Sequence, residues 1–185
     1  MRERSDEELM KAWSGGSMEA FETLYSRYRG PLYRYLLRLA GTETGANDLY
    51  QGAWEKVIAA RRKLPDKAPF RAWLFRVAHN HAMDGFRRRQ AETGLETETL
   101  AASSPGPADL AAAAEQRQSL ESAVQALPAE QRDALLLKLE GGLDLDESAR
   151  ITGVGKETAK SRLRYAVARL KKTMASNSTE VKHEH

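Results

Sequence analysis

Apolar residues recur at intervals of three and four along nearly the whole chain, which is the spacing of amphipathic helices. The clearest apolar stripes lie in segments 5–14, 18–39, 44–62, 70–90 and 156–172. The sequence contains no alternating run rich in Val, Ile and Thr that would predict a strand. The pattern therefore predicts an all-α protein.

Capping residues and breakers divide this pattern into separate helices. Ser5 or Asp6 is expected to cap the first helix, and Ser17 the second, because their side-chain oxygens can accept a free N–H of the first turn. Pro31 should kink or divide the second helix. Thr44 or Asn47 is the expected cap of the third.

Segment 143–172 predicts a helix-turn-helix. Asp144 and Glu147 have the D-x-x-E spacing of a capping box, and Gly153 suits the end of a short helix. The following helix begins near residue 156 and carries a basic outer face. Such a pair is typical of proteins that read DNA in the major groove. A helical hairpin with a solvated basic face is the alternative.

The charge is strongly segregated although the net charge is only +3. Residues 61–90 contain nine Lys and Arg against two acids, and residues 150–174 contain eight against one. Residues 91–149, between these blocks, contain three Lys and Arg against twelve acids. Two basic blocks favour two contacts with a polyanion. Two solvated helix faces without a partner would give the same counts.

The same boundaries predict two small helical domains joined by a flexible linker. Residues 1–90 form the first domain and residues 115–175 the second. Residues 91–114 form the linker, which is acidic and contains the run SSPGP at 103–107. Residues 176–185 are polar and are expected to be a disordered tail.

Candidate catalytic chemistry is sparse. The chain has no cysteine, which excludes disulfides and thiolate metal sites. His79 and His81 are two residues apart on a helix and point to different sides, so they do not chelate one ion together with Asp84. We find no phosphate-binding glycine loop, and we expect no enzyme activity, no cofactor and no metal. The charged N-terminus and the lack of a long apolar run predict a cytoplasmic protein without membrane insertion.

Two stretches together resemble the extracytoplasmic-function (ECF) sigma factors of bacterial RNA polymerase. They are PFRAWLFRVAHNHAMDGFRRR with the preceding DLYQGAWEKV, and LPAEQRDALLLKLEGGLDLDESARITGVGKETAKSRLRYAVARLKK. The resemblance extends over about residues 5–174. It implies a protein that binds core RNA polymerase and directs initiation at promoters.

The resemblance also implies roles by position. The helix at residues 48–57 would dock on the clamp of the polymerase through Asp48, Leu49, Gln51 and Trp54. The N-terminal domain would recognise and open the −10 element as a single strand through Lys63, Lys67, Arg71, Arg76, Asn80, Asp84 and Arg87. The second helix of the helix-turn-helix would read the −35 duplex through Lys156, Lys160, Ser161, Arg162, Arg164, Tyr165 and Arg169. An anti-sigma factor or a Ser/Thr kinase is a candidate regulator.

The docking helix departs from the family pattern. Family members carry several acids here, whereas this chain has Gly45, Asn47 and Gly52 and keeps only Asp48. Gly52 also costs helix stability, about 1 kcal/mol relative to Ala. We therefore hypothesise that docking needs activation by phosphorylation of Thr42 or Thr44, close to a helix N-terminus where negative charge is favoured.

Three other interpretations remain open from the sequence. The first is a LuxR-like helix-turn-helix regulator that is not a sigma factor, against which the helical, basic N-terminal half argues. The second is a helical hydrolase built around His79, His81 and Asp84. The third is an interaction module whose basic faces bind an acidic protein.

Overall fold

The structure, a computed structural model, describes residues 3–65, 68–94 and 111–180, and every regular element within these ranges is helical. The prediction of an all-α protein is confirmed. In chain order the elements are α1 (Asp6–Ser14), α2 (Met18–Ala40), α3 (Glu43–Ala59), the short 3₁₀ helix η1 (Arg61–Lys63), α4 (Phe70–Thr93), α5 (Ala111–Gln125), α6 (Ala129–Leu139), α7 (Leu145–Thr152) and α8 (Lys156–Glu180).

The expected caps of the first two helices are present, but α3 begins earlier than predicted. Ser5 forms a capping box with Glu8, and Ser17 caps α2. The cap of α3 is Thr42, whose hydroxyl accepts a hydrogen bond from Gly45 N at 3.2 Å. The prediction of Thr44 or Asn47 was wrong because Gly41, in the left-handed region at φ 74°, ends α2 directly before Thr42 and leaves no longer loop.

Helix α2 continues through Pro31 and is not divided there. Proline removes one hydrogen bond of the helix ladder. The helix has buried residues on both sides of this defect, including Leu24 and Leu36, so packing against neighbouring helices compensates for the lost bond.

The N-terminal half packs α1, α3 and α4 around α2. Aromatic rings fill much of the core between these helices. The ring centroids of Trp13 and Phe21 lie 5.0 Å apart, and those of Tyr25 and Trp54 lie 4.8 Å apart. Phe70 is fully buried at the start of α4 and meets Trp13 edge-on. These aromatics therefore hold the helices of the N-terminal half together.

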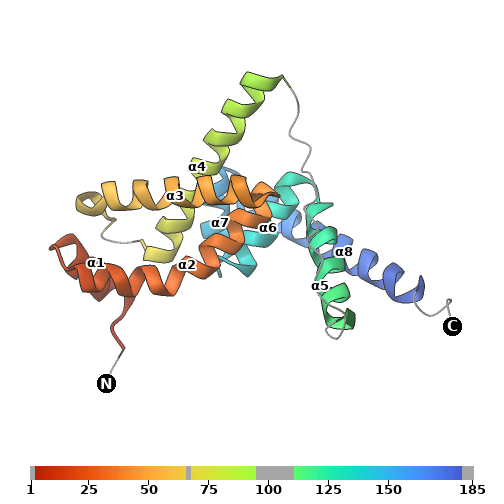
Figure 1. Cartoon of the computed structure of the whole chain (residues 1–185), viewed down its shortest axis with the longest axis horizontal. Coiled ribbons are helices and arrows are strands. Elements are labelled where there is room, and N and C mark those ends of the chain that lie inside the picture. Colours follow the sequence, from red (N-terminus) through yellow and green to blue (C-terminus); the bar gives the residue numbers. More distant parts are fainter. Residues whose placement is uncertain (1–2, 66–67, 95–110, 181–185) are drawn as a thin grey trace.

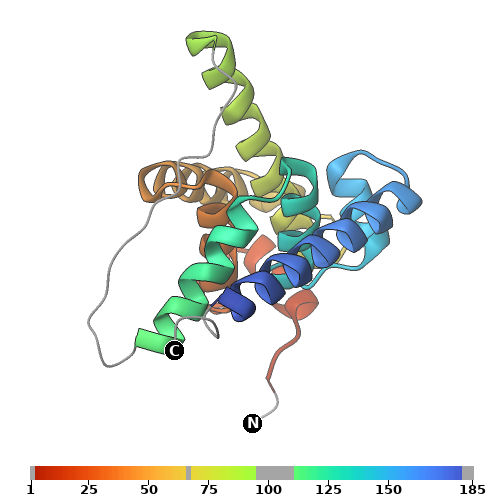
Figure 2. The same ribbon diagram turned by 90° about the vertical axis from the view of Figure 1, so that its right-hand side faces the viewer.

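The C-terminal half is built on α8, which contacts α5, α6 and α7. Figure 2 shows α5 and α8 lying next to each other along one side of the molecule. Leu136, Leu137, Leu143 and Ala166 are buried between these helices. Helix α8 runs to Glu180 and so enters segment 176–185, for which we expected a disordered tail.

The two halves pack against each other. Helix α6 contacts α2, and α7 contacts α4 (Figure 1). The buried apolar residues of both halves form one continuous cluster. The C-terminal turns of α4 instead project away from the body of the molecule (Figure 1). Most of the predicted linker, residues 95–110, lies outside the described residues.

Candidate nucleic-acid interface

Helices α7 and α8 form the helix-turn-helix that the sequence predicts. Asp144 and Glu147 make a capping box at the start of α7, with N–H to carboxylate distances of 2.8 and 2.9 Å. Gly153 ends α7 in the left-handed region at φ 69°. Gly155 precedes α8, and its carbonyl accepts the first hydrogen bond of that helix from Ala159 N at 3.0 Å. The capping chemistry therefore fixes where α7 ends and where α8 begins.

Helix α8 presents a basic outer face. Ala159 and Ala166 are buried against the other helices of this half, whereas Lys160, Arg164 and Arg169 are exposed. Tyr165 is 52% exposed, and the Arg164 guanidinium lies 5.2 Å from the centroid of its ring. An exposed row of this kind can place cations on phosphates and an aromatic hydroxyl near base edges.

Three of the predicted residues on α8 are less free than the others. Lys156 is exposed but makes an ion pair with Asp146 at 3.0 Å, and this carboxylate raises the pKa of the Lys156 ammonium. Ser161 and Arg162 are half-buried. Val167, which the apolar spacing placed in the core, is 36% exposed. Packing against α5, α6 and α7 decides this, because the Ala159 and Ala166 side of the helix is the buried one.

A second polar row lies on α4. Arg76, Asn80, Asp84 and Arg87 are all exposed, and their spacing of four, four and three residues places them on one face of the helix. Asp84 and Arg87 form an ion pair. Lys63 is exposed on η1, and Lys67 lies outside the described residues. Arg71 does not belong to this row: it is half-buried, and its Nη1 lies 3.2 Å from the position that a Cβ on Gly142 would occupy.

Of the four residues assigned to docking on α3, two are exposed and two are buried. Asp48 and Gln51 are exposed, but Leu49 is only 4% exposed and Trp54 only 5%. Their side chains belong to the buried core. The exposed row continues instead through Glu55 and Ile58.

The predicted docking set leaves out both of these exposed residues. Glu55 accepts a hydrogen bond from Gln51 at 2.9 Å, and Ile58 is 52% exposed. Continuing from Asp48 and Gln51 in steps of three and four residues would have found them.

A groove of about 520 Å³ separates α3 from α4 next to this row. It is lined by residues of both helices, including Asp48, Glu55, Arg88 and Arg89. Gly52 and His81 also line the groove, and the His81 imidazole packs directly against that glycine. Burial lowers the pKa of His81, and the positive charges of Lys56 and Arg88 lower it further.

His79 and His81 point in different directions, as predicted. His81 faces Gly52 on α3, whereas His79 is buried with Nδ1 at 3.2 Å from Asp133 of α6. In the part of the chain that the structure describes, no three His, Cys, Asp or Glu side chains gather as metal ligands. No helix in the described ranges is long and apolar enough to cross a membrane.

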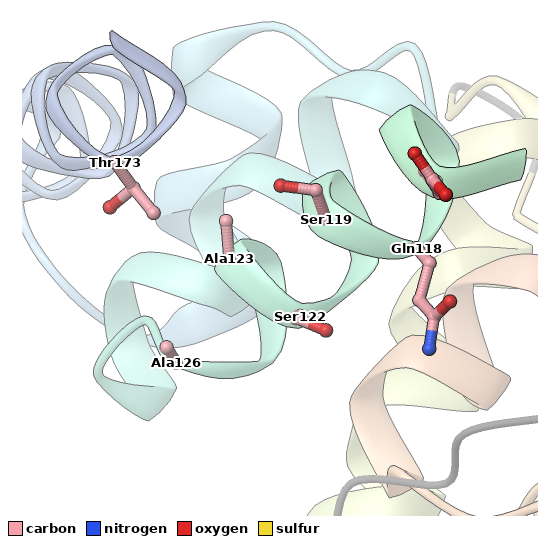
Figure 3. A pocket seen from close by; sticks show the side chains of 7 residues that line it. Gln118, Ser119, Ser122, Ala123, Ala126 and Thr173 are labelled. Carbon is pink, nitrogen blue, oxygen red and sulfur yellow. The ribbon is translucent and has the colours of Figure 1, made fainter. Parts of the chain in front are cut away.

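An open hollow of about 540 Å³ lies between α5 and α8 (Figure 3). Short side chains line most of it, such as Ser122 and Ala123 on α5 and Thr173 on α8. Glu115 is the one titratable residue among those that line it. This set offers no pair of groups for acid–base or nucleophilic chemistry.

Two family models match the chain where these surfaces lie. Sigma-70 region 2 matches residues 24–92, which contain α3 and α4, and Sigma-70 region 4 matches residues 117–170, which contain the helix-turn-helix. A match to region 2 is not expected of a LuxR-like regulator, so that alternative finds no support.

Curated relatives of similar length also align with nearly the whole chain. The ECF RNA polymerase sigma factor SigM of Mycobacterium tuberculosis is 31% identical over 179 residues, which cover 97% of this chain and 89% of SigM. The RNA polymerase sigma factor CarQ of Myxococcus xanthus is 26% identical over 176 residues, which cover 93% of this chain and 99% of CarQ.

Two solved structures share the fold. One is CnrH in complex with the cytosolic domain of CnrY, with a TM-score of 0.70 and 22% identity, covering 94% of this chain and 99% of CnrH. The other is the sigma factor RpoE in complex with the anti-sigma factor NepR from Bartonella quintana, with a TM-score of 0.69 and 24% identity, covering 85% and 98% of the two chains.

The fold and the two polar surfaces thus define a two-domain transcription factor of the sigma class. The chain belongs to the ECF RNA polymerase sigma factors. It is accordingly a DNA-binding initiation factor whose partners are core RNA polymerase and promoter DNA, and this class of protein is not an enzyme class.

Proposed function

We propose that the three exposed rows divide the work of initiation among α3, α4 and α8. The row on α3 docks on the polymerase, the row on α4 binds the −10 element and its opened strand, and the row on α8 reads the −35 duplex. The observation that carries this proposal is the presence of two polar rows, each with exposed arginines, on separate helices within the segments matched by regions 2 and 4. Because promoters lie on the chromosome, we place this activity in the cytoplasm.

The division between α4 and α8 is tested by run-off transcription with purified core polymerase. Lys160→Ala with Arg164→Ala should weaken initiation on a promoter that has a −35 element and have little effect on a template already opened at −10. Arg76→Ala with Arg87→Ala should weaken both. Lys11→Ala, an exposed charge on α1, is the matched control. Equal losses for both double variants on both templates would contradict the division.

The docking row on α3 is Asp48, Gln51, Glu55 and Ile58. An exposed aliphatic next to carboxylates suits a partner that presents both a basic and an apolar surface. Asp48→Ala and Ile58→Ala should each weaken retention of the protein by immobilised core polymerase. Glu22→Ala, an exposed acid on α2, serves as the control. Retention equal to that of the unaltered protein for both variants would exclude this row.

We propose Thr44 as the activating phosphorylation site in preference to Thr42. The Thr42 hydroxyl is the cap of α3, so a phosphate there would replace a structural contact. Thr44 is exposed in the first turn of α3. Arg89 of α4 lies nearby, with Nη1 at 3.6 Å from a Cβ placed on neighbouring Gly45. A phosphate on Thr44 would add negative charge at a helix N-terminus within reach of this arginine.

A comparison of Thr44→Glu with Thr44→Gln tests this proposal, because the two changes differ only in charge. Thr44→Glu should increase retention by core polymerase, and Thr44→Gln should not. Equal retention of the two variants would refute phosphorylation of Thr44 as the activating step. It would not bear on the proposal that the α3 row docks on the polymerase.

A further inference from the structure

Helix α8 carries a single acid near its start, in the middle of a basic surface. Glu157 is the second residue of the helix and the only acidic residue in segment 150–174, which contains eight Lys and Arg. Its side chain is 85% exposed. Phosphates repel a carboxylate, so an acid at this place opposes the sequence-independent part of DNA binding. Glu157 therefore calls for another role on this surface.

Glu157 lies on the face of α8 that carries the basic row. Lys160 and Arg164 follow it at intervals of three and four residues, and all three side chains are exposed. Ala159 and Ala166 are buried on another side of the helix. In a helix-turn-helix, residues near the N-terminus of the second helix reach base edges in the major groove. Glu157, in the first turn, is therefore placed at the bases of a duplex that this row binds.

The charge of Glu157 is compensated on the helix itself. The Nζ of Lys160 lies 4.0 Å from its Oε2, and this cation lowers the cost of bringing the carboxylate close to DNA. Both side chains are largely exposed, so their ion pair adds little to stability. An acid in the first turn of a helix also gains from the positive end of the helix dipole. Glu130 has that same local role in the first turn of α6.

The chemistry of the major groove limits what Glu157 can bind. A carboxylate only accepts hydrogen bonds. Guanine and thymine present acceptors on this edge, with the thymine methyl group beside them, and so offer no donor. Adenine presents its N6 amino group next to the acceptor N7, which repels a carboxylate. Cytosine presents its N4 amino group alone. Cytosine is thus the base that fits Glu157.

We propose that Glu157 is a specificity-determining residue that accepts a hydrogen bond from N4 of one cytosine in the −35 element. This inference rests on the proposed function, because it requires that the α8 row read the −35 duplex. Lys160 and Arg164 supply attraction to DNA, whereas Glu157 disfavours every sequence without a donor at its position. A carboxylate left unpaired in the groove costs free energy, so the discrimination comes mainly from rejection of the other bases.

A promoter library tests the assignment. The templates carry a fixed −10 element and a randomised −35 window, and a barcode in each transcript identifies the −35 sequence that core polymerase used with the full-length protein. With the unaltered protein, one position of the window should favour cytosine on one strand. Glu157→Ala should reduce that preference roughly tenfold. Glu157→Gln should move it toward adenine, because an amide both accepts from N6 and donates to N7.

Glu130→Ala is the matched control. It removes an exposed first-turn acid from another helix of the same half and leaves α8 unaltered, so every base preference should stay the same. If Glu157 served only to stabilise the start of α8, Glu157→Ala would lower transcription from all −35 sequences by one common factor. That result would leave the relative use of the four bases unchanged and would contradict the assignment.

Two further outcomes would overturn the reading of cytosine by Glu157. One is an unchanged cytosine preference for both Glu157 variants, and the other is selection by the unaltered protein of a −35 sequence without a favoured cytosine. Equal use of all −35 sequences by the unaltered protein would instead refute the proposed function of the α8 row.

Discussion

Replacing Gly52 by alanine tests the observation that the His81 side chain packs against Gly52 in the groove between α3 and α4. A Cβ built on Gly52 would lie 2.2 Å from His81 Nε2 and 2.8 Å from Cε1, which is too close for either atom. The imidazole is the end of a flexible side chain and is only half-buried. It would therefore have to rotate out of the groove, while the backbone of α4 could stay in place.

Two opposing free energies decide the outcome. Alanine is favoured over glycine inside a helix by about 1 kcal/mol. Displacing a packed side chain costs about 1–3 kcal/mol, and a side chain that can turn toward solvent belongs at the lower end of that range. The two contributions nearly cancel, so Gly52→Ala should leave the free energy of unfolding almost unchanged. In a His81→Ala background the clash is absent, and the same substitution should stabilise by about 1 kcal/mol.

Urea denaturation of the four proteins of this double-mutant cycle, followed by circular dichroism, measures the difference. The expected interaction energy between the two positions is about 1 kcal/mol. An increase of about 1 kcal/mol in the free energy of unfolding for Gly52→Ala in both backgrounds would show that the His81 ring does not fill the space next to Gly52. The geometry also affects docking, because Gly52→Glu restores an acid to α3 only if His81 moves. Its effect on polymerase binding should therefore be read in the His81→Ala background.

Three further predictions follow from single contacts. Asp144→Ala removes the capping box of α7 and should lower the free energy of unfolding by about 1 kcal/mol in urea denaturation, whereas an unchanged value would show that the cap is dispensable. Lys160→Gln should reduce the slope of log affinity for −35 duplex against log salt by about 1 in a fluorescence titration, and an unchanged slope would mean that Lys160 does not meet a phosphate. The lowered pKa of His81 means that the unfolded chain binds a proton more readily than the folded protein, so stability should fall as the pH drops below about 6.5. His81→Gln should reduce this loss in thermal denaturation across that range, and an identical pH profile would assign the loss to other groups.

Local chemistry explains why much of the fold was predictable. A capping box at Asp144 and Glu147, a left-handed Gly153 and apolar spacing along α8 act within one or two helical turns, so the sequence alone indicates them. The same holds for the exposed row on α4, since residues three and four apart on a helix share a face in any tertiary context. Arg76, Asn80, Asp84 and Arg87 are placed together by that rule.

Contacts between distant helices decided the features that were missed. Helix α3 has apolar residues on more than one side, and only its packing against α2 and α4 shows that Leu49 and Trp54 are buried. The apolar spacing of α8 likewise did not distinguish buried Ala166 from exposed Val167, because packing against the other helices of this half makes that choice.

Periodicity, capping and charge are local properties, so the sequence is enough to predict an all-α chain with two basic helices, a helix-turn-helix and the family pattern. That the two halves pack together is visible only in the three-dimensional structure. The fold brings Asp133 of α6 within hydrogen-bonding distance of Tyr35 on α2 and His79 on α4. Tyr35 and Asp133 are 98 residues apart in the chain. No local pattern encodes such a contact, since it depends on how α6 is placed against α2 and α4.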